Sequence, residues 1–303
     1  MPVILPQLSR RDFLKRAALA GAAAAFAPSG YAGLFGKSRD KHTFALFSDP
    51  HVAADTALKN NGVNMADNLA AGVRELAAWP VKPAAVIVNG DLAFKSGQPA
   101  DYATFGRLIE PLRALAPVHL SLGNHDEREH FWSAFPHDAA KLKAVPQKQA
   151  AVFASADANW YLLDSLDITL STPGELGPAQ LTWLTAELAA RPETPAVIVA
   201  HHNLKNTGGI SGLKDSAALE DLFARHAQVK AFVFGHTHNW HVETHMSGVH
   251  LVNLPPTGYV FQAGRPSGWV RCTLARGGAE FELRSLDPKH PEQAQVKKLS
   301  WRA

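Results

Sequence analysis

The chain has 303 residues, of which 46% are apolar and 19% are charged, a composition typical of a globular protein that buries a sizeable core. Its single cysteine, Cys272, excludes an intramolecular disulfide and a thiolate metal site, since such a site needs several cysteines. Residues 1–32 hold four basic residues and one acidic residue, so residues 33–303 carry the other 26 basic and 26 acidic residues. Because the formal charge of +3 comes wholly from residues 1–32, no nucleic-acid partner is expected.

Residues 1–32 form a separate segment. Ser9–Lys15 (SRRDFLK) resembles the twin-arginine export signal of bacteria, and an alanine-rich run follows from Ala17 to Ala27. The alternative is a short amphipathic or membrane-anchoring helix, but the run is shorter than the ~20 apolar residues that span a bilayer. We therefore expect an export signal read by the twin-arginine machinery, no stable membrane insertion, and a periplasmic or exported protein. Residues 33–42 are polar and glycine-containing, and are predicted to be a linker.

Strand and helix patterns alternate through most of the remaining chain. In chain order, we expect a strand at 43–47, a helix at 64–79, a strand at 84–88, a helix at 102–115, a strand at 118–122, one or two strands within 152–164, a helix at 178–190, a strand at 196–200, a helix at 216–226 and a strand at 229–234. This alternation predicts an α/β fold.

The pattern changes after residue 238. Strands are expected at 249–254, 269–274 and 280–286, and Gly277-Gly278 predicts a hairpin between the last two. The predicted domain therefore covers residues 43–286, and residues 287–303 are expected to form a polar, irregular tail.

Five short polar motifs each follow an apolar strand pattern. They are Asp49-Pro50-His51, Gly90-Asp91, Gly123-Asn124-His125-Asp126, His201-His202 and Gly235-His236-Thr237-His238. Each motif alone is weak, since a lone Asp-x-His is more often a turn carboxylate with a surface histidine. In an α/β sheet, however, the carboxyl ends of the strands lie together and ligands bind there. Together the motifs supply oxygen and imidazole ligands for about two metal ions, a known device for breaking phosphate esters.

The five motifs, in this order from Asp49 to His238, resemble the signature of the calcineurin-like metallophosphoesterases. Further matches are similar to its class III cyclic nucleotide phosphodiesterase branch, which includes glycerophosphodiester hydrolases: Gly90-Asp91-Leu92, Gly97, Tyr102, Pro117, residues 123–128 and Gln180-Leu181 with Trp183-Leu184. The chain departs from that branch at Asn203, where a proline is usual after the two histidines. The resemblance implies a four-layer sandwich of two mixed β-sheets flanked by helices.

The resemblance also implies a ligand set for two divalent or trivalent ions, with Mn, Fe, Zn, Ni or Co suited to imidazole and carboxylate ligands. Asp49, His51 and His238 would hold the first ion, Asn124, His201 and His236 the second, and Asp91 would bridge both. Two divalent ions, two aspartates and a bridging hydroxide leave a net positive charge, which would attract a phosphate anion.

The implied activity is hydrolysis of a small phosphodiester, such as a cyclic nucleotide or a glycerophosphodiester, by attack of a metal-bound hydroxide. His125 would give a proton to the leaving group or steady the phosphoryl oxygens; its alternative role is a supporting hydrogen bond. Phosphomonoester hydrolysis by the same centre is the alternative activity, and a non-catalytic metal- or phosphate-binding protein is a less favoured one. The balanced charge argues against nucleic-acid cleavage.

Several residues near the motifs keep two interpretations. Arg128 could contact the substrate phosphate or form a surface ion pair with a neighbouring glutamate. His241, His245 and His250 could support the ligands from outside the centre or lie apart from it. The family's ligand matches His201 rather than His202, and the remaining histidines are expected to be solvated or structural.

Overall fold

The computed structural model describes residues 39–139, 145–205, 207 and 209–303. The predicted export signal, and the predicted linker before residue 39, lie outside the described residues. The end of that linker is attached to the fold, because Arg39 forms a β-bridge with Lys82 and the Asp40 backbone N–H donates to the Lys82 carbonyl. Within the described residues, no helix is long and apolar enough to cross a lipid bilayer.

The first β-sheet has six strands in the order β14–β13–β12–β1–β4–β5. Three neighbouring strands are parallel: β1 (Thr43–Ser48), β4 (Ala85–Asn89) and β5 (Val118–Ser121). The other three extend the sheet by antiparallel pairing: β12 (Gly268–Ala275), β13 (Gly278–Ser285) and β14 (Val296–Ser300). The sheet is therefore mixed, and its parallel part directs the ends of β1, β4 and β5 to one edge.

The second β-sheet is also mixed and has the order β10–β11–β9–β8–β7–β6. Its central strands are parallel: β11 (His250–Asn253), β9 (Val229–Phe234), β8 (Ala196–Val199) and β7 (Asn159–Leu162). Its two edge strands pair antiparallel: β10 (His241–Thr244) and β6 (Ala151–Ala154).

Alternation of side chains along the strands produces four layers. In β1, Phe44 and Leu46 face a core between the two sheets, where they meet Trp160 of β7. Ala45 and Phe47 face the opposite way, into a core shared with α2 (Met65–Ala78) and α3 (Pro99–Leu115). Successive strand residues point to opposite faces, so every residue of β1 is buried.

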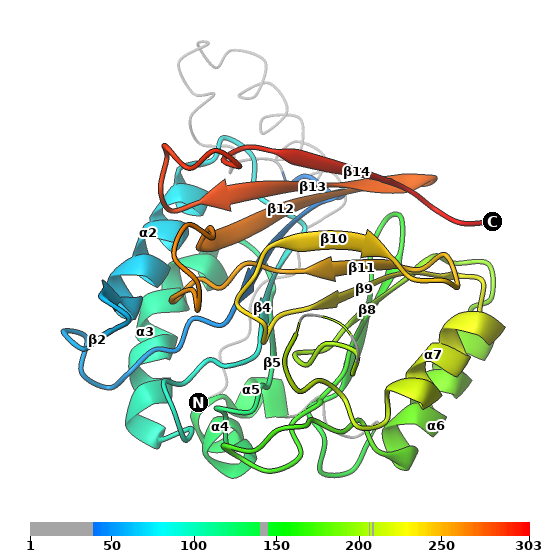
Figure 1. Cartoon of the computed structure of the whole chain (residues 1–303), viewed down its shortest axis with the longest axis horizontal. Helices are drawn as coiled ribbons and strands as arrows, with labels where there is room; N and C mark the ends of the chain where they lie inside the picture. The colour runs from blue at the N-terminus through cyan, green and yellow to red at the C-terminus, as the bar shows by residue number, and fades with distance from the viewer. Residues whose placement is uncertain (1–38, 140–144, 206, 208) are drawn as a thin grey trace, which may run out of the picture. The chain divides into compact units, whose positions relative to one another are not determined.

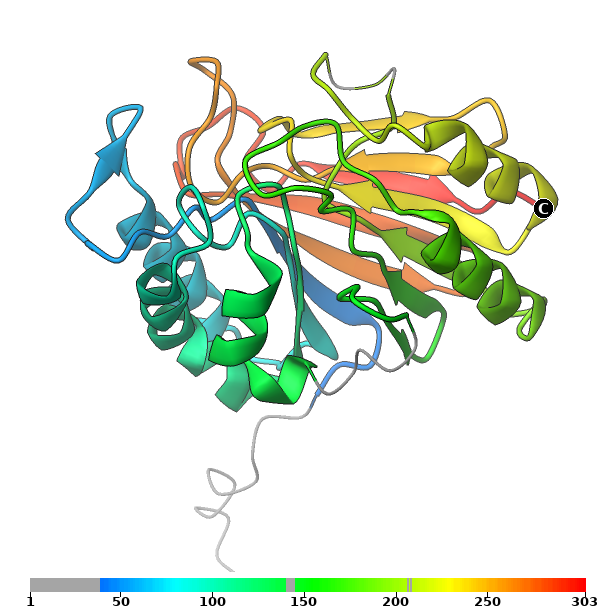
Figure 2. The same cartoon turned by 90° about the horizontal axis from the view of Figure 1, so that it is seen from below.

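A third core lies on the outer face of the second sheet. There Ile198 and Phe232 pack against α6 (Pro178–Ala189) and α7 (Ser216–Arg225). In Figure 1, α2 and α3 lie beside one sheet and α6 and α7 beside the other. Figure 2 shows the same order from below, with the strands between the two pairs of helices. The predicted helix–sheet–sheet–helix sandwich is confirmed.

Elements absent from the sequence prediction are short or exposed. They are the hairpin β2 (Lys59–Asn60) with β3 (Val63–Asn64), the helices α4 (Arg128–Ala134) and α5 (Pro136–Ala139), the edge strand β10, and β14. The prediction that the tail from Asp287 is irregular is wrong, because residues 296–300 form β14 and pair with β13. Alternate residues of β14 are exposed, so it lacks the apolar run that marks the central strands.

Candidate metal centre

The five polar motifs meet at the carboxyl ends of five parallel strands. The first three follow β1, β4 and β5 of one sheet, and the last two follow β8 and β9 of the other. Backbone hydrogen bonds join the loops beyond the strands, from Asp49 N–H to the Gly90 carbonyl and from Gly235 N–H to the His201 carbonyl. The side chain of Asn89 joins the two sheets, because its amide donates to the Ala200 carbonyl over 2.9 Å. The topology therefore brings motifs 187 residues apart into one place.

The backbone at these loops is strained. Positive φ angles of 47° to 65° occur at Asp49, His51, Asp91, His236 and His238. These five are among nine non-glycine residues with positive φ in the described chain. Non-glycine residues rarely adopt this conformation, and it clusters at functional sites where the surroundings enforce it. The surrounding structure therefore holds these five residues in an unfavourable backbone conformation, which fixes the direction of their side chains.

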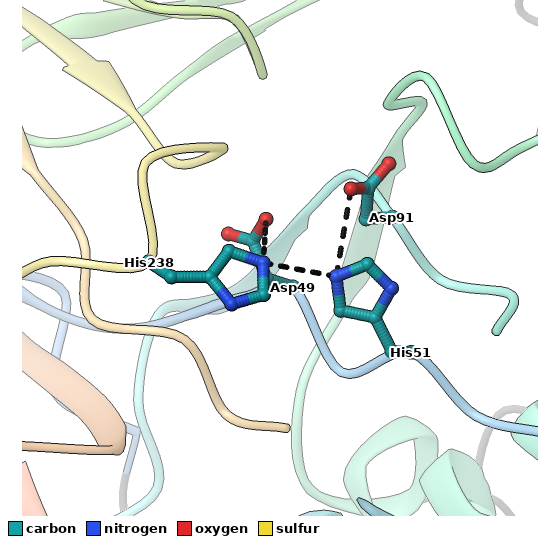
Figure 3. A group of neighbouring side chains, drawn as sticks. All are labelled: Asp49, His51, Asp91 and His238. Carbon is teal, nitrogen blue, oxygen red and sulfur yellow. Dashed lines mark hydrogen bonds and ion pairs between the residues drawn. The ribbon is translucent and has the colours of Figure 1, made fainter. Parts of the chain in front are cut away.

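One group of potential ligands contains Asp49, His51, Asp91 and His238, each offering an atom within 4.8 Å of the others. Figure 3 shows the four side chains pointing toward one another. His51 Nε2 lies 3.0 Å from His238 Nε2 and 3.5 Å from Asp91 Oδ2. His238 Nε2 lies 3.4 Å from Asp49 Oδ1. All four residues are buried, so these polar groups face one another and not water.

A second group contains Asp91, His201 and His236. His201 Nε2 lies at ion-pair distances of 3.3 Å from Asp91 Oδ2 and 3.8 Å from Asp49 Oδ1. It has no hydrogen-bond partner. Asp91 belongs to both groups, which is the position expected of a bridging carboxylate. The sequence prediction depended on this convergence, and the structure shows it.

Asn124 completes the set of seven. Its neighbour His125 donates its backbone N–H to Asp91 Oδ1 over 2.8 Å, which holds this loop at the second group. The Asn124 side-chain oxygen is buried and has no hydrogen-bond partner. A buried acceptor without a partner is costly, and a bound cation would satisfy it. The orphaned oxygen of Asn124 and the orphaned Nε2 of His201 therefore both fit a metal site.

Hydrogen bonds to backbone carbonyls set the tautomer of all four histidines. Because a carbonyl only accepts, the bonded ring nitrogen carries a proton, and in the neutral imidazole the other nitrogen has its lone pair directed at the centre. The bonds run from His51 Nδ1 to Phe94 (3.3 Å), from His201 Nδ1 to Asn89 (3.1 Å), from His238 Nδ1 to Tyr259 (2.5 Å) and from His236 Nε2 to Ser211 (3.0 Å).

Burial and charge together shift the pKa values of the centre. Burial raises the pKa of Asp49, but His201 and His238 outweigh it and bring that pKa to about 2. Burial acts on Asp91 in the same way, and His201 still holds its pKa well below the usual range. Burial lowers the pKa of His201, but Asp91 and Asp49 raise it to about 10. A proton on His201 thus compensates the two carboxylates, and metal binding would displace it.

Two of the histidines, His51 and His236, are neutral at pH 7. Burial lowers the pKa of His51 to about 3. Burial, followed by the nearby His201 charge, lowers the pKa of His236 to about 4. Neutral imidazole is the form that binds metals, so both side chains are ready to coordinate at neutral pH.

Two glycines leave room for the ligands. A Cβ at Gly123 would lie 2.6 Å from the Asp91 backbone nitrogen and 2.7 Å from His201 Nε2. A Cβ at Gly235 would overlap the Asp49 carboxylate and the Ser48 hydroxyl. Real Cβ atoms do not approach other atoms so closely, so only glycine fits at either position.

Asp126 has a positioning role that the sequence did not reveal, although it stands in the third motif. Its buried carboxylate accepts backbone N–H groups of Leu92, Ala93 and Gly123 over 2.9 to 3.2 Å, and the Tyr102 hydroxyl over 3.1 Å. Burial and the neighbouring Asp91 charge raise its pKa to about 7. Asp126 therefore fastens the loop after β5 to the loop after β4, which carries Asp91.

His202 and Asn203 support the loop after β8. His202 Nδ1 lies 2.8 Å from the Ser165 hydroxyl, and its ring centre is 4.5 Å from that of His236. The Asn203 amide donates to the Leu204 carbonyl over 2.8 Å and also to the Thr207 carbonyl. Asn203 thus holds the start of this loop by hydrogen bonds.

Three later histidines do not contact either ligand group. His241 lies 3.8 Å from Glu243, His245 bonds the Ser247 hydroxyl and His250 bonds the Ser300 carbonyl. The interpretation that they support the centre is therefore wrong, and the alternative, that they lie apart from it, holds.

Arg128 does not form the surface ion pair with a neighbouring glutamate, and its contact with a substrate phosphate stays a prediction. Its guanidinium lies 2.7 Å and 3.0 Å from the two oxygens of Asp164, a fully buried residue 36 positions away. The same guanidinium donates to the Leu166 carbonyl. Arg128 is therefore held in an ion pair with a buried carboxylate.

Replacing Arg128 with alanine should destabilise the fold by about 3 kcal/mol, because it leaves the buried Asp164 carboxylate without its cation. The kcat/KM of the folded fraction should not change. Chemical denaturation of purified protein measures the first quantity. Arg191→Ala is the matched control, since Arg191 forms an exposed i,i+4 helix pair with Glu187 and should cost only about 0.3–0.5 kcal/mol. Wild-type stability of Arg128→Ala together with a raised KM would indicate that Arg128 contacts the substrate.

Comparison with known proteins agrees with this geometry. A family model described as calcineurin-like phosphoesterase matches residues 42–240. The chain belongs to the calcineurin-like phosphoesterase family. This confirms the resemblance inferred from the five motifs, all of which lie inside the matched residues.

This phosphoesterase has curated relatives with cyclic nucleotide names. It is 28% identical over 244 residues, covering 78% of this chain and 84% of the relative, to a 3′,5′-cyclic adenosine monophosphate phosphodiesterase of Haemophilus influenzae. It is 27% identical over 226 residues, covering 73% and 80%, to a 3′,5′-cyclic-nucleotide phosphodiesterase of Nostoc sp.. A solved dimetal phosphatase from Danio rerio shares the fold, with a TM-score of 0.66 and 17% identity over 86% of this chain and 99% of that one.

Proposed function

We propose that this calcineurin-like phosphoesterase hydrolyses a small phosphodiester, of the cyclic nucleotide or glycerophosphodiester type, at a centre of two metal ions. The observation that carries the proposal is the position of Asp91 in both ligand groups. A single carboxylate shared by two sets of buried imidazoles suits a pair of adjacent cations. The relatives named above, both called cyclic nucleotide phosphodiesterases, support the diester class.

Seven residues would hold the two ions. Asp49, His51 and His238 would hold the first, Asn124, His201 and His236 the second, and Asp91 both. Imidazole, carboxylate and amide oxygen suit Mn, Fe, Co, Ni or Zn. When bound, such a pair polarises a phosphoryl group and lowers the pKa of a coordinated water.

His125 is the proposed proton donor. It is partly exposed, and its ring centre lies 5.0 Å from that of His51 at the edge of the first group. Its Nδ1 donates to the Lys95 carbonyl over 2.8 Å, which orients the ring and leaves Nε2 for the substrate. A protonated Nε2 would give its proton to the leaving oxygen as the phosphate ester bond breaks.

Replacing His125 with alanine should lower kcat by roughly a hundredfold or more, because the leaving oxygen would depart without a proton. Metal content should stay at the wild-type value. Steady-state kinetics and elemental analysis of the same samples test both statements. His130→Ala is the matched control, since His130 also bonds a backbone carbonyl, that of Gly97, but belongs to neither ligand group. If His125→Ala loses metal together with activity, His125 has the alternative, structural role.

The class of ester is tested by comparing bis-aryl and mono-aryl phosphates with metal-reconstituted enzyme. We expect the diester to have the higher kcat/KM, and 3′,5′-cyclic AMP to be hydrolysed. A strong preference for the monoester would overturn the diester proposal in favour of phosphomonoester hydrolysis by the same centre. Protein that binds two metals but turns over neither ester would indicate a non-catalytic binding protein.

We also propose that residues 1–32 direct export through the twin-arginine machinery to the periplasm or beyond. The segment Ser9–Lys15 with the alanine-rich run after it supports this. In a bacterial host, the full chain should reach the periplasm, and replacing Arg10 and Arg11 together with lysine should keep it inside the cell. Unchanged fractionation of the double variant would contradict the proposal.

A further inference from the structure

A hollow of about 390 Å³ lies beside the proposed metal centre, a size within the range of small-ligand sites. It is lined by Gly209, Ile210, Thr237, His238, Asn239, Phe261, Gln262 and Arg265. His238 is also a member of the first ligand group. A phosphate at the centre would therefore place one of its ester arms next to the hollow.

The hollow has an aromatic wall. The Phe261 ring stacks on the His238 ring, with centroids 4.0 Å apart and an angle of 8° between the planes. Phe261 is 54% exposed, although most phenylalanines of the described chain are buried. The loop after β11 that carries Phe261 and Tyr259 runs along this edge of the molecule, seen as the orange loop in Figure 2. An exposed ring anchored on a metal-ligand histidine is a platform for stacking a planar group.

The polar groups of the hollow further restrict the class of ligand that fits there. The Asn239 side-chain oxygen is buried and has no hydrogen-bond partner among the described atoms. Gln262 and Arg265 add donors, and none of the eight lining residues is acidic. A cationic arm such as choline would meet Arg265 without a compensating carboxylate. A neutral planar arm with hydrogen-bond donors and acceptors meets a stacking face and the polar side chains of Gln262 and Arg265.

We propose that this hollow is the ester-arm subsite, and that it binds a nucleobase stacked on Phe261 and hydrogen-bonded to the polar side chains that line the hollow. The inference rests on the proposed phosphodiesterase function and narrows its substrate class to nucleotides over glycerophosphodiesters. It assigns Phe261 a role in specificity and leaves the proton transfer to His125.

Calorimetric binding to metal-reconstituted protein tests the subsite without requiring turnover. The probes are inorganic phosphate, ribose 5-phosphate and 5′-AMP, with released phosphate measured in each sample. Wild-type protein should bind 5′-AMP about tenfold more tightly than ribose 5-phosphate, the effect of one stacked base. Phe261→Ala and Phe261→Leu should abolish that tenfold difference, and Phe261→Trp should keep it. Affinity for inorganic phosphate should stay the same in all variants.

Met246→Ala provides the control, since Met246 is an apolar side chain that is 96% exposed in the turn between β10 and β11. It should leave all three affinities unchanged. Equal affinity of wild-type protein for 5′-AMP and ribose 5-phosphate, or a difference that survives in Phe261→Ala, would overturn the subsite. Tighter binding of phosphocholine than of 5′-AMP would also overturn it. Failure of diester turnover alone would count against the proposed function and leave these binding results to be judged separately.

Discussion

Asp91→Asn should reduce diester turnover by roughly a thousandfold or more, the scale seen when charge stabilisation is removed from an active site. Asp91 is the only residue that belongs to both ligand groups of the described chain. An amide keeps the shape of the side chain but loses the negative charge that would hold two cations together. Metal content should fall from two ions per chain to one or fewer, measured by elemental analysis after dialysis.

The exposed carboxylate of Asp221 on α7 gives the control, and Asp221→Asn should keep both ions and full activity. The apo form of Asp91→Asn should still fold, because the amide keeps the shape of the side chain and its oxygen can still accept the His125 backbone N–H. Retention of two ions with wild-type kcat in Asp91→Asn would contradict the bridging role.

Gly123→Ala should abolish most activity and reduce metal affinity, although the substitution adds a single methyl group. The new Cβ would overlap the Asp91 carboxylate and lie 2.7 Å from His201 Nε2. Either the loop after β5 moves, taking Asn124 with it, or Asp91 and His201 separate. Overpacking of this kind costs about 1–3 kcal/mol of folding stability. Thermal unfolding, metal content and kcat/KM should all fall together.

Gly277→Ala is the matched control, because a Cβ at Gly277 meets no atom within 4 Å. That variant, in the turn between β12 and β13, should retain wild-type activity and metal content. If Gly123→Ala behaves like Gly277→Ala, the ligand geometry described for Asp91 and His201 is incorrect.

The convergence of the five motifs could be predicted from the sequence because the fold places strand ends predictably, whereas the assignment of individual ligands came from the family resemblance. Asp49 and Asp91 each follow a buried strand within a few residues, and parallel strands deliver such residues to one edge. The central strands were equally predictable, since each is a continuous buried run. Which imidazole nitrogen faces the centre was not predictable, because carbonyls such as those of Asn89 and Ser211 decide it from distant positions.

Contacts between residues that are far apart in the chain could not be predicted from the sequence, because no local pattern marks them. Arg128 and Asp164 are 36 positions apart and belong to no local pattern, so their buried pairing appears only when the chain is folded. Asp126 stands in a recognisable motif, but its role depends on N–H groups of the loop after β4. Strand β14 depends on pairing with β13, and not on an apolar run of its own.

The proposed function depends on two cations that share Asp91. A crystal structure of metal-reconstituted protein, with anomalous scattering recorded at the absorption edge of the added metal, measures this directly. We expect two anomalous peaks, both within coordination distance of the Asp91 carboxylate, with Asn124 at one peak and His51 at the other. A single peak, or two peaks of which only one touches Asp91, would contradict it.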